Sequence, residues 1–89
     1  MTSETTEGFR KALDNLPTEI QAKARQAYRR FNQDPYYPSL HFKQVHDNKP
    51  IYSVRIGRNW RALGEREGEK ITWFWIGSHA DYDNVLMQL

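Results

Sequence analysis

The chain has 89 residues, of which 38% are hydrophobic and 13% aromatic, and its formal net charge is +2. This length allows a single domain over residues 1–89, whose small core leaves it marginally stable without a partner. The composition excludes a disordered chain, and the absence of cysteine excludes disulfides and thiolate metal sites. No apolar run approaches the roughly 18 residues that span a membrane, and no secretory signal is present, so we expect a cytoplasmic protein.

Two helices are predicted in the first part of the chain. The first runs over Glu7–Leu16 and ends before Pro17, because proline disfavours a helical residue before it. The second runs over Thr18–Asn32, where Thr18 and Gln21 have the spacing of a capping box. Apolar residues recur at helical spacing, so the two helices are expected to form an antiparallel hairpin with one buried side. The expected core residues of these helices are Phe9, Leu13, Ile20, Ala24, Ala27 and Phe31.

From Leu40 onward the apolar residues alternate, which is typical of strands. Turns are predicted at Asp47–Pro50, at Arg58-Asn59 as a two-residue hairpin loop, and at Gly68. The strands between them are expected at Leu40–Val45, Tyr52–Ile56, Trp60–Glu65 and Ile71–Ile76, with Val54, Ile56 and Leu63 in the core.

The Ile71–Ile76 strand is apolar on both sides, which predicts a central position in the sheet. Simple alternation places Trp73 and Trp75 on one face and Phe74 on the other. Ser78 and Asp81 have capping-box spacing and predict a short C-terminal helix ending at Leu89. The fold class is therefore α+β: a helical hairpin on one face of a small antiparallel sheet, followed by a terminal helix.

A group of arginines, a histidine and a tyrosine is expected at one end of this sheet. Arg55 and Arg61 lie on neighbouring strands, and His79 and Tyr82 follow the last strand. Arginine binds phosphate through its planar guanidinium, and histidine transfers protons near neutral pH. Together they can promote attack of a ribose 2′-hydroxyl on its own phosphate, which needs a base, an acid and cations but no metal. The combination indicates RNA.

Each candidate also has a structural interpretation. Arg55, Arg61 and the loop residue Arg58 could be solvated or paired with nearby glutamates. Lys43 could protect an edge strand from aggregation. His79 could belong to the helix cap and Tyr82 to the core. His41 and His46 are expected on the strand surface, and no cluster of histidines and acids indicates a metal site.

Three segments resemble the RelE/ParE superfamily of toxin–antitoxin toxins: Ile20–Leu40, YSVRIGRNWRALG and WFWIGSHADYDNVL. The order of elements is similar across nearly the whole chain. The resemblance implies a RelE-like fold, an antitoxin partner and, for the enzymatic branch, metal-independent cleavage of mRNA on the ribosome without a cofactor. It places Arg55, Arg61, His79 and Tyr82 at the catalytic positions. Lys43 and Arg58 are candidates for RNA binding from their own positions, on an edge strand and in the hairpin loop.

Other functions remain open beside this one. The ParE branch poisons DNA gyrase without nuclease chemistry, and a degenerate member or an unrelated RNA-binding domain would only bind. Enzymatic members begin with a strand, whereas only eight mostly polar residues precede Phe9 here, so that strand is expected to be missing or very short. Five acids are also expected near the site, where they would weaken RNA binding: Glu65, Glu67, Glu69, Asp81 and Asp83.

Overall fold

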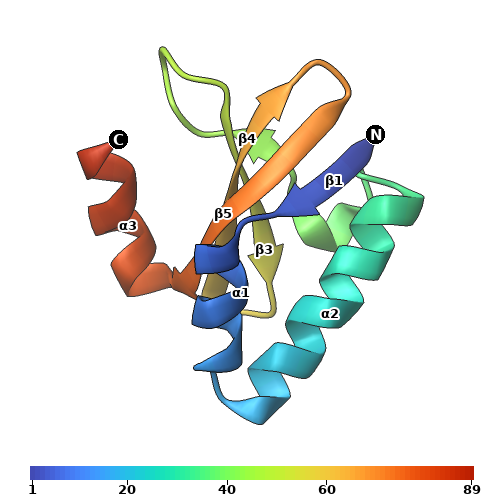
Figure 1. Ribbon diagram of the computed structural model, residues 1–89, viewed down its shortest axis with the longest axis vertical. Coiled ribbons are helices and arrows are strands. Elements are labelled where there is room, and N and C mark those ends of the chain that lie inside the picture. The colour runs from blue at the N-terminus through green and yellow to red at the C-terminus, as the bar shows by residue number, and fades with distance from the viewer.

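The computed structural model describes residues 1–89 as a five-stranded sheet with helices on both faces (Figure 1). The strand order is β1-β5-β4-β3-β2. The helices are α1 (Glu7–Asp14), α2 (Thr18–Gln33), a 3₁₀ turn η1 (Pro38–Leu40) and α3 (His79–Gln88). The strands are β1 (Thr2–Thr5), β2 (Lys43–Gln44), β3 (Ile51–Ile56), β4 (Trp60–Glu67) and β5 (Lys70–Ser78). The α+β class and the two N-terminal helices are confirmed.

The N-terminal strand is present, and the sheet is mixed rather than antiparallel. β1 pairs in parallel with β5, so Thr2 lies beside Lys70 and Thr5 beside Trp73. Strand β1 has only four residues, so of the two expected outcomes the very short strand is the one observed. Its side chains are exposed or half-buried and follow no apolar alternation, so the sequence shows no strand pattern there. β1 covers the edge of β5 that a four-stranded sheet would leave unpaired, which removes a site for edge-to-edge aggregation.

The predicted strand Leu40–Val45 is mostly wrong. Pro38 begins a 3₁₀ turn, and His41 then adopts a left-handed conformation with φ of 48°. Only Lys43 and Gln44 pair with β3, opposite Ser53 and Tyr52. The far half of β3 therefore forms a free edge of the sheet. Leu40 nevertheless belongs to the core, because the 3₁₀ turn directs its side chain inward and leaves it 1% exposed.

The turns and caps differ in detail from the expected ones. The β3–β4 loop has three residues, and Gly57 rather than Asn59 carries the positive φ, at 61°. The turn at Gly68 and the cap by Ser78 are as predicted, since Ser78 Oγ accepts a hydrogen bond from the Asp81 backbone at 3.1 Å. Thr18 does not cap α2, which begins after Pro17 without a side-chain cap.

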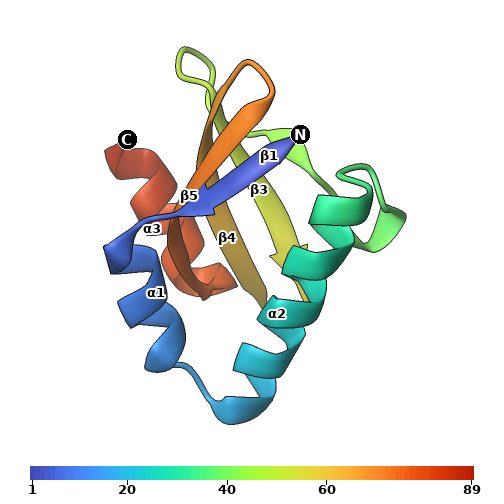
Figure 2. The ribbon, with the colours of Figure 1, turned by 45° about the vertical axis from the view of Figure 1, so that its right-hand side comes forward.

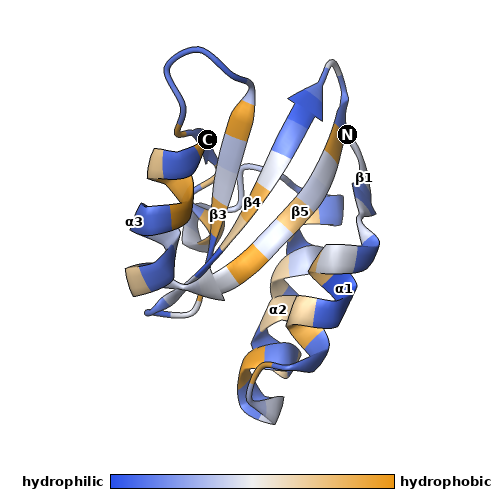
Figure 3. Ribbon diagram, turned by 60° about the vertical axis from the view of Figure 1, so that its left-hand side comes forward, coloured by the Kyte–Doolittle hydropathy of each residue, from blue (hydrophilic) through white to orange (hydrophobic).

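The two faces of the sheet carry separate apolar clusters. α1 and α2 cover the cluster on one face, and α3 covers the smaller cluster on the other, so no open aromatic face remains (Figure 3). Of the expected core residues, Leu13 is only half-buried and Leu63 lies in the smaller cluster. The larger cluster is built on Phe9, Ala24, Ala27, Phe31, Leu40, Val54, Ile56, Ala62, Ile71, Trp73 and Ile76. The smaller one contains Ile51, Leu63 and Tyr82, with Phe74 and Trp75 packed against them.

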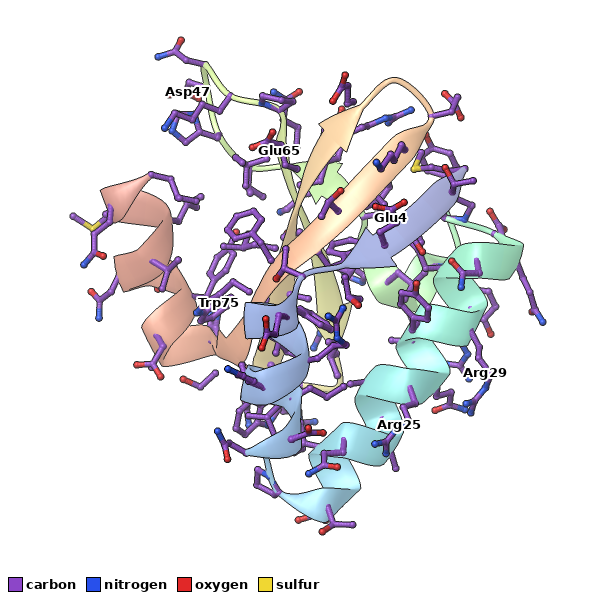
Figure 4. The ribbon with its side chains drawn as sticks, viewed as in Figure 1. Glu4, Arg25, Arg29, Asp47, Glu65 and Trp75 are labelled. Atoms are coloured by element: carbon purple, nitrogen blue, oxygen red, sulfur yellow. The ribbon has the colours of Figure 1, made fainter.

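A β-bulge explains why Trp73 and Trp75 lie on opposite faces of the sheet. Leu63 pairs with Trp75 but Gly64 pairs with Trp73, so Phe74 is the extra residue in β5. A bulge reverses the alternation of side chains beyond it. Trp73 therefore points into the α1–α2 side, whereas Phe74 and Trp75 both face α3, which is the side on which Figure 4 shows Trp75. The predicted shared face of the two tryptophans is wrong.

Helices α1 and α2 diverge rather than forming a closed hairpin (Figure 2). They meet at the short connection Asn15–Pro17, where Gln21 Nε2 donates hydrogen bonds to the carbonyls of Asp14 and Leu16 at 3.1 and 2.9 Å. Gln21 thus stabilises the C-terminus of α1, not the N-terminus of its own helix. The divergence leaves a cleft over the sheet. No helix of the protein is both long and apolar enough to cross a membrane.

Candidate functional site

Arg55 and Arg61 stand directly opposite each other on β3 and β4. Residues at such positions have Cβ atoms about 5 Å apart and project from the same face, where two like charges destabilise a sheet. Neither arginine is in a salt bridge. Arg55 Nε donates to the carbonyl of Gly57 at 3.0 Å, and Arg61 Nη1 donates to that of Trp60 at 2.9 Å. Both guanidiniums thus lack a carboxylate, and an anion between them would relieve their repulsion.

His79 lies at the same end of the sheet as this pair. It is the first residue of α3, and its backbone N–H donates to the carbonyl of Asn59 at 2.7 Å. That bond ties the start of α3 to the β3–β4 loop, while Gly77 two residues earlier pairs with Arg61. The imidazole is exposed and stacks on Tyr82, with ring centroids 5.8 Å apart. The predicted convergence of arginine and histidine is therefore present in the backbone geometry.

Tyr82 is buried, with 9% of its surface exposed. Its ring packs with Ile51 and Leu63 under α3, so the core-packing alternative describes its surroundings. A ring so enclosed cannot stack a base without displacing this cluster. One side of the Tyr82 ring lies against the His79 imidazole.

Lys43 and Arg58 border the arginine pair from two directions. Lys43 pairs with Ser53, two residues before Arg55 on the same face, which makes it a diagonal neighbour of Arg55 at about 7–8 Å. Arg58 is exposed in the β3–β4 loop. The three arginines thus lie at the loop end of β3–β4, Lys43 lies on the neighbouring strand β2, and His79 and Tyr82 lie in the first turn of α3. Their side chains do not form one closed pocket.

Three of the five acids expected near the site lie far from it. β4 runs away from Arg61 toward Glu67, and six residues of strand span about 20 Å. Glu65, Glu67 and Glu69 are thus at the other end of the sheet, where Glu69 pairs with Arg66 at 3.3 Å. Only the acids of α3 remain close to His79 in the chain. The electrostatic objection to RNA binding at Arg55 and Arg61 is accordingly weaker than the sequence suggests.

The diverging helices α1 and α2 enclose an apolar cleft of about 320 Å³. Its walls include Phe9, Ala24 and Val54, and its floor reaches Trp73 in the sheet. Arg10, Arg25 and Arg29 line it as well, and none of them is in a salt bridge. Figure 4 shows Arg25 and Arg29 along α2. The cleft combines an apolar interior with three arginines, which fits an amphipathic segment that carries acids.

Residues of α2 also line a second, polar groove. Lys23 and Arg30 of α2 line this groove, together with His41 and with Arg55 at the free edge of β3. Sequence reasoning missed this groove because it depends on two features that have no clear pattern, the shortness of β2 and the left-handed backbone of His41. No group of three or more histidines, aspartates or glutamates in the protein could hold a metal ion.

The fold is similar to that of several solved toxin structures. The toxin–antitoxin complex RelB–RelE of Methanococcus jannaschii superimposes with a TM-score of 0.74 and 18% identity, covering 92% of this chain and 96% of that chain. YafQ of Escherichia coli superimposes with a TM-score of 0.71 and 10% identity, covering 90% of this chain and 94% of that chain. The RelBE2 toxin–antitoxin complex of Mycobacterium tuberculosis superimposes with a TM-score of 0.69 and 21% identity, covering 86% of this chain and 95% of that chain. These matches define a RelE-like α+β fold.

The sequence itself places the chain within this class. Residues 18–84, more than half of the chain, match the ParE-like toxin domain. The protein therefore belongs to the ParE-like toxin family of the RelE/ParE superfamily. None of the curated proteins matches it in sequence.

Proposed function

We propose that this protein is the toxin of a type II toxin–antitoxin pair and that it cleaves mRNA on the ribosome in the cytoplasm. The toxin assignment is supported by the family match and by structural neighbours that are toxins, some solved with their antitoxins. The observation that carries the nuclease assignment is the unpaired cross-strand pair of Arg55 and Arg61 beside His79.

In the proposed reaction the two arginines hold the scissile phosphate. The ribose 2′-hydroxyl attacks the adjacent phosphorus, its proton passes to a base, and the 5′-oxygen of the next nucleotide leaves with a proton from an acid. The guanidiniums of Arg55 and Arg61 offset the negative charge that develops on the phosphate oxygens. The products are a 2′,3′-cyclic phosphate and a 5′-hydroxyl, and no metal takes part.

His79 exchanges the proton, and Tyr82 positions the His79 imidazole. The stacked Tyr82 ring fixes the imidazole plane, and the bond from the His79 backbone to Asn59 fixes its distance from the β3–β4 loop. Lys43 and Arg58 contact the RNA backbone on either side. One histidine cannot supply both the base and the acid in a single step, so we infer that the ribosome supplies the substrate geometry and the second proton-transfer group.

The antitoxin is proposed to place an acidic amphipathic segment in the cleft between α1 and α2. The apolar walls would bury one side of the segment, and Arg10, Arg25 and Arg29 would pair with its carboxylates. Co-expression with the neighbouring reading frame and affinity purification tests this. Arg25→Glu with Arg29→Glu should slow association and weaken the complex, whereas the exposed control Lys11→Glu should not. Equal recovery of the partner with both variants would rule out the cleft.

The nuclease assignment is tested by cleavage of ribosome-bound mRNA in a translating extract. Arg61→Ala should reduce the rate by about 10²–10³, the usual effect of losing a preorganised charge. His79→Ala should reduce it by about 10²–10⁴. Lys70→Ala, which removes an exposed charge paired with Glu4, is the control and should cleave normally. Cleavage should survive EDTA, and melting temperatures should stay close to that of the wild type.

A gyrase poison is the second candidate function. The family match is to a ParE-like domain, and Tyr82 is buried, so its ring is not free to contact a substrate. Under this candidate the protein binds its target by contact alone. If the wild type arrests growth and Arg61→Ala and His79→Ala are equally toxic, the nuclease assignment fails. Inhibition of DNA supercoiling by gyrase in the presence of the protein would then support the gyrase poison.

A further inference from the structure

The polar groove between α2, the η1 turn and the free edge of β3 is strongly cationic. Its lining includes the side chains of Lys23, Arg30, His41 and Arg55, together with the polar residues Gln26 and Ser39. No acid lines it, and its volume is about 480 Å³. This volume lies within the range of ligand sites and far exceeds the roughly 30 Å³ of one water molecule.

The cations of the groove are positioned by contacts other than salt bridges. The Lys23 chain lies over Gly57, where a Cβ would meet Lys23 Cδ at 3.4 Å and Nζ at 3.8 Å. Arg55 Nε donates to the carbonyl of the same glycine. The Arg30 guanidinium lies over the ring of Tyr37, with its carbon 5.0 Å from the ring centroid. None of the three has a carboxylate partner.

The backbone of His41 supports a built site. It is the only residue other than glycine with a positive φ in the protein. A left-handed conformation costs free energy for a side-chain-bearing residue and persists where its surroundings impose it. Here it turns the chain from η1 toward β2, and His41 lines the groove.

The groove offers cations at several positions along its length. Lys23, Gln26 and Arg30 form one stripe of α2, and seven residues of helix separate the Cα atoms of Lys23 and Arg30 by about 10 Å. With Arg55 on β3, these cations are spaced to contact successive phosphates of one strand. Arg55 belongs to the groove and also to the pair with Arg61, so the groove is continuous with the candidate catalytic end of the sheet.

We propose that this groove binds the phosphodiester backbone of single-stranded RNA, with Lys23 and Arg30 contacting phosphates beyond the one held by Arg55 and Arg61. This proposal rests on the proposed nuclease function for the path of the RNA strand toward Arg55 and Arg61. Binding of RNA in the groove does not itself require cleavage. An acidic peptide is the other polyanion of suitable charge. It is less suited, because the hydrophobic residues of the groove lining are only Ala27 and Leu40, whereas the lining of the α1–α2 cleft is mostly hydrophobic.

The test measures binding separately from cleavage. Fluorescence anisotropy follows a short single-stranded RNA whose 2′-hydroxyls are methylated, so that it cannot be cut. Lys23→Gln with Arg30→Gln is compared with Lys11→Gln with Lys70→Gln, which removes the same charge from two exposed ion pairs. Each phosphate contact on a single strand contributes about 0.7 to the slope of log affinity against log salt, so the groove variant should lose about 1.4.

Each outcome of this experiment either supports or overturns the RNA-binding proposal. A groove variant that loses affinity and salt slope while the control retains both supports the proposal, even if no RNA is ever cleaved. Equal binding by the two variants overturns it, even if the wild type cleaves mRNA. Displacement of the RNA by polyglutamate at equal charge concentration, with the same sensitivity to Lys23 and Arg30, overturns it in favour of a peptide site.

Discussion

Gly64 is a tightly packed point of the β4–β5 pairing and offers a strict test of the fold. It lies beside the bulge, where a Cβ would meet Trp73 Cε3 at 2.7 Å and Ile71 Cγ1 and Cδ1 at 2.8 and 3.0 Å. Real Cβ contacts are almost never this short. Both neighbours are held in the main core, with 2% and 0% of their surfaces exposed, so neither can move aside into solvent.

Gly64→Ala should therefore overpack the core. Such insertions typically cost about 1–3 kcal/mol. For a domain of this size each kcal/mol lowers the melting temperature by about 4–8 °C, so the expected decrease is roughly 4–24 °C. The buried indole of Trp73 lies at the contact, so its fluorescence should change in the folded state as well.

Gly8→Ala is the matched control for this substitution. Gly8 lies in the first turn of α1, and the nearest atom to its Cβ would be Thr6 Oγ1 at 3.9 Å. Alanine there restricts the unfolded chain without strain and should raise stability by about 0.4–1 kcal/mol. Thermal melting followed by circular dichroism measures both variants. If Gly64→Ala melts at or above the wild-type temperature, the bulge and the packing of Trp73 against Gly64 are wrong.

Three further predictions use the same melting and binding assays. Val54→Asp buries an unpaired charge between α2 and the sheet and should cost several kcal/mol, on the order of the whole stability of a small domain; unchanged melting would refute the strand-face assignment. Ser78→Ala should cost about 0.5–2 kcal/mol because Ser78 caps α3, whereas Thr18→Ala should cost less because Thr18 caps nothing; equal losses would contradict this difference. Lys43→Ala should weaken RNA binding modestly and reduce its salt slope by about 0.7, and an unchanged slope would exclude it from the RNA path.

The sequence predicts the elements whose apolar residues are periodic. The stripe of Ile20, Ala24, Ala27 and Phe31 locates α2 to within one residue of its observed end, and the alternation of Val54 and Ile56 assigns the inner face of β3. The same alternation places Arg55 on the other face. The pairing of Arg61 with Arg55 was not predictable in this way, because the expected two-residue loop would have placed Ala62 opposite Arg55, whereas the observed three-residue loop places Arg61 there.

The errors arise where long-range pairing decides the structure. β1 forms because β5 offers it a parallel edge, and the sequence Thr2–Thr5 shows no sign of this. The bulge at Phe74 depends on the register between β4 and β5, so strict alternation put Trp75 on the wrong face. The burial of Tyr82 follows from α3 folding back over the sheet. The polar groove depends on where β2 ends, which no periodicity predicts.

Helix α2 separates two surfaces of different chemistry, and this bears on how an antitoxin would act. Ala24, Arg25 and Arg29 face the apolar cleft, whereas Lys23 and Arg30 face the polar groove on the other side of the same helix. A segment seated only in the cleft would leave Arg55, Arg61 and His79 uncovered. An antitoxin that binds in this way would leave binding of the uncleavable RNA intact. It would neutralise the toxin by sterically preventing it from entering the ribosome. If the antitoxin instead abolishes RNA binding, it must extend past the cleft and cover the cationic end of the sheet.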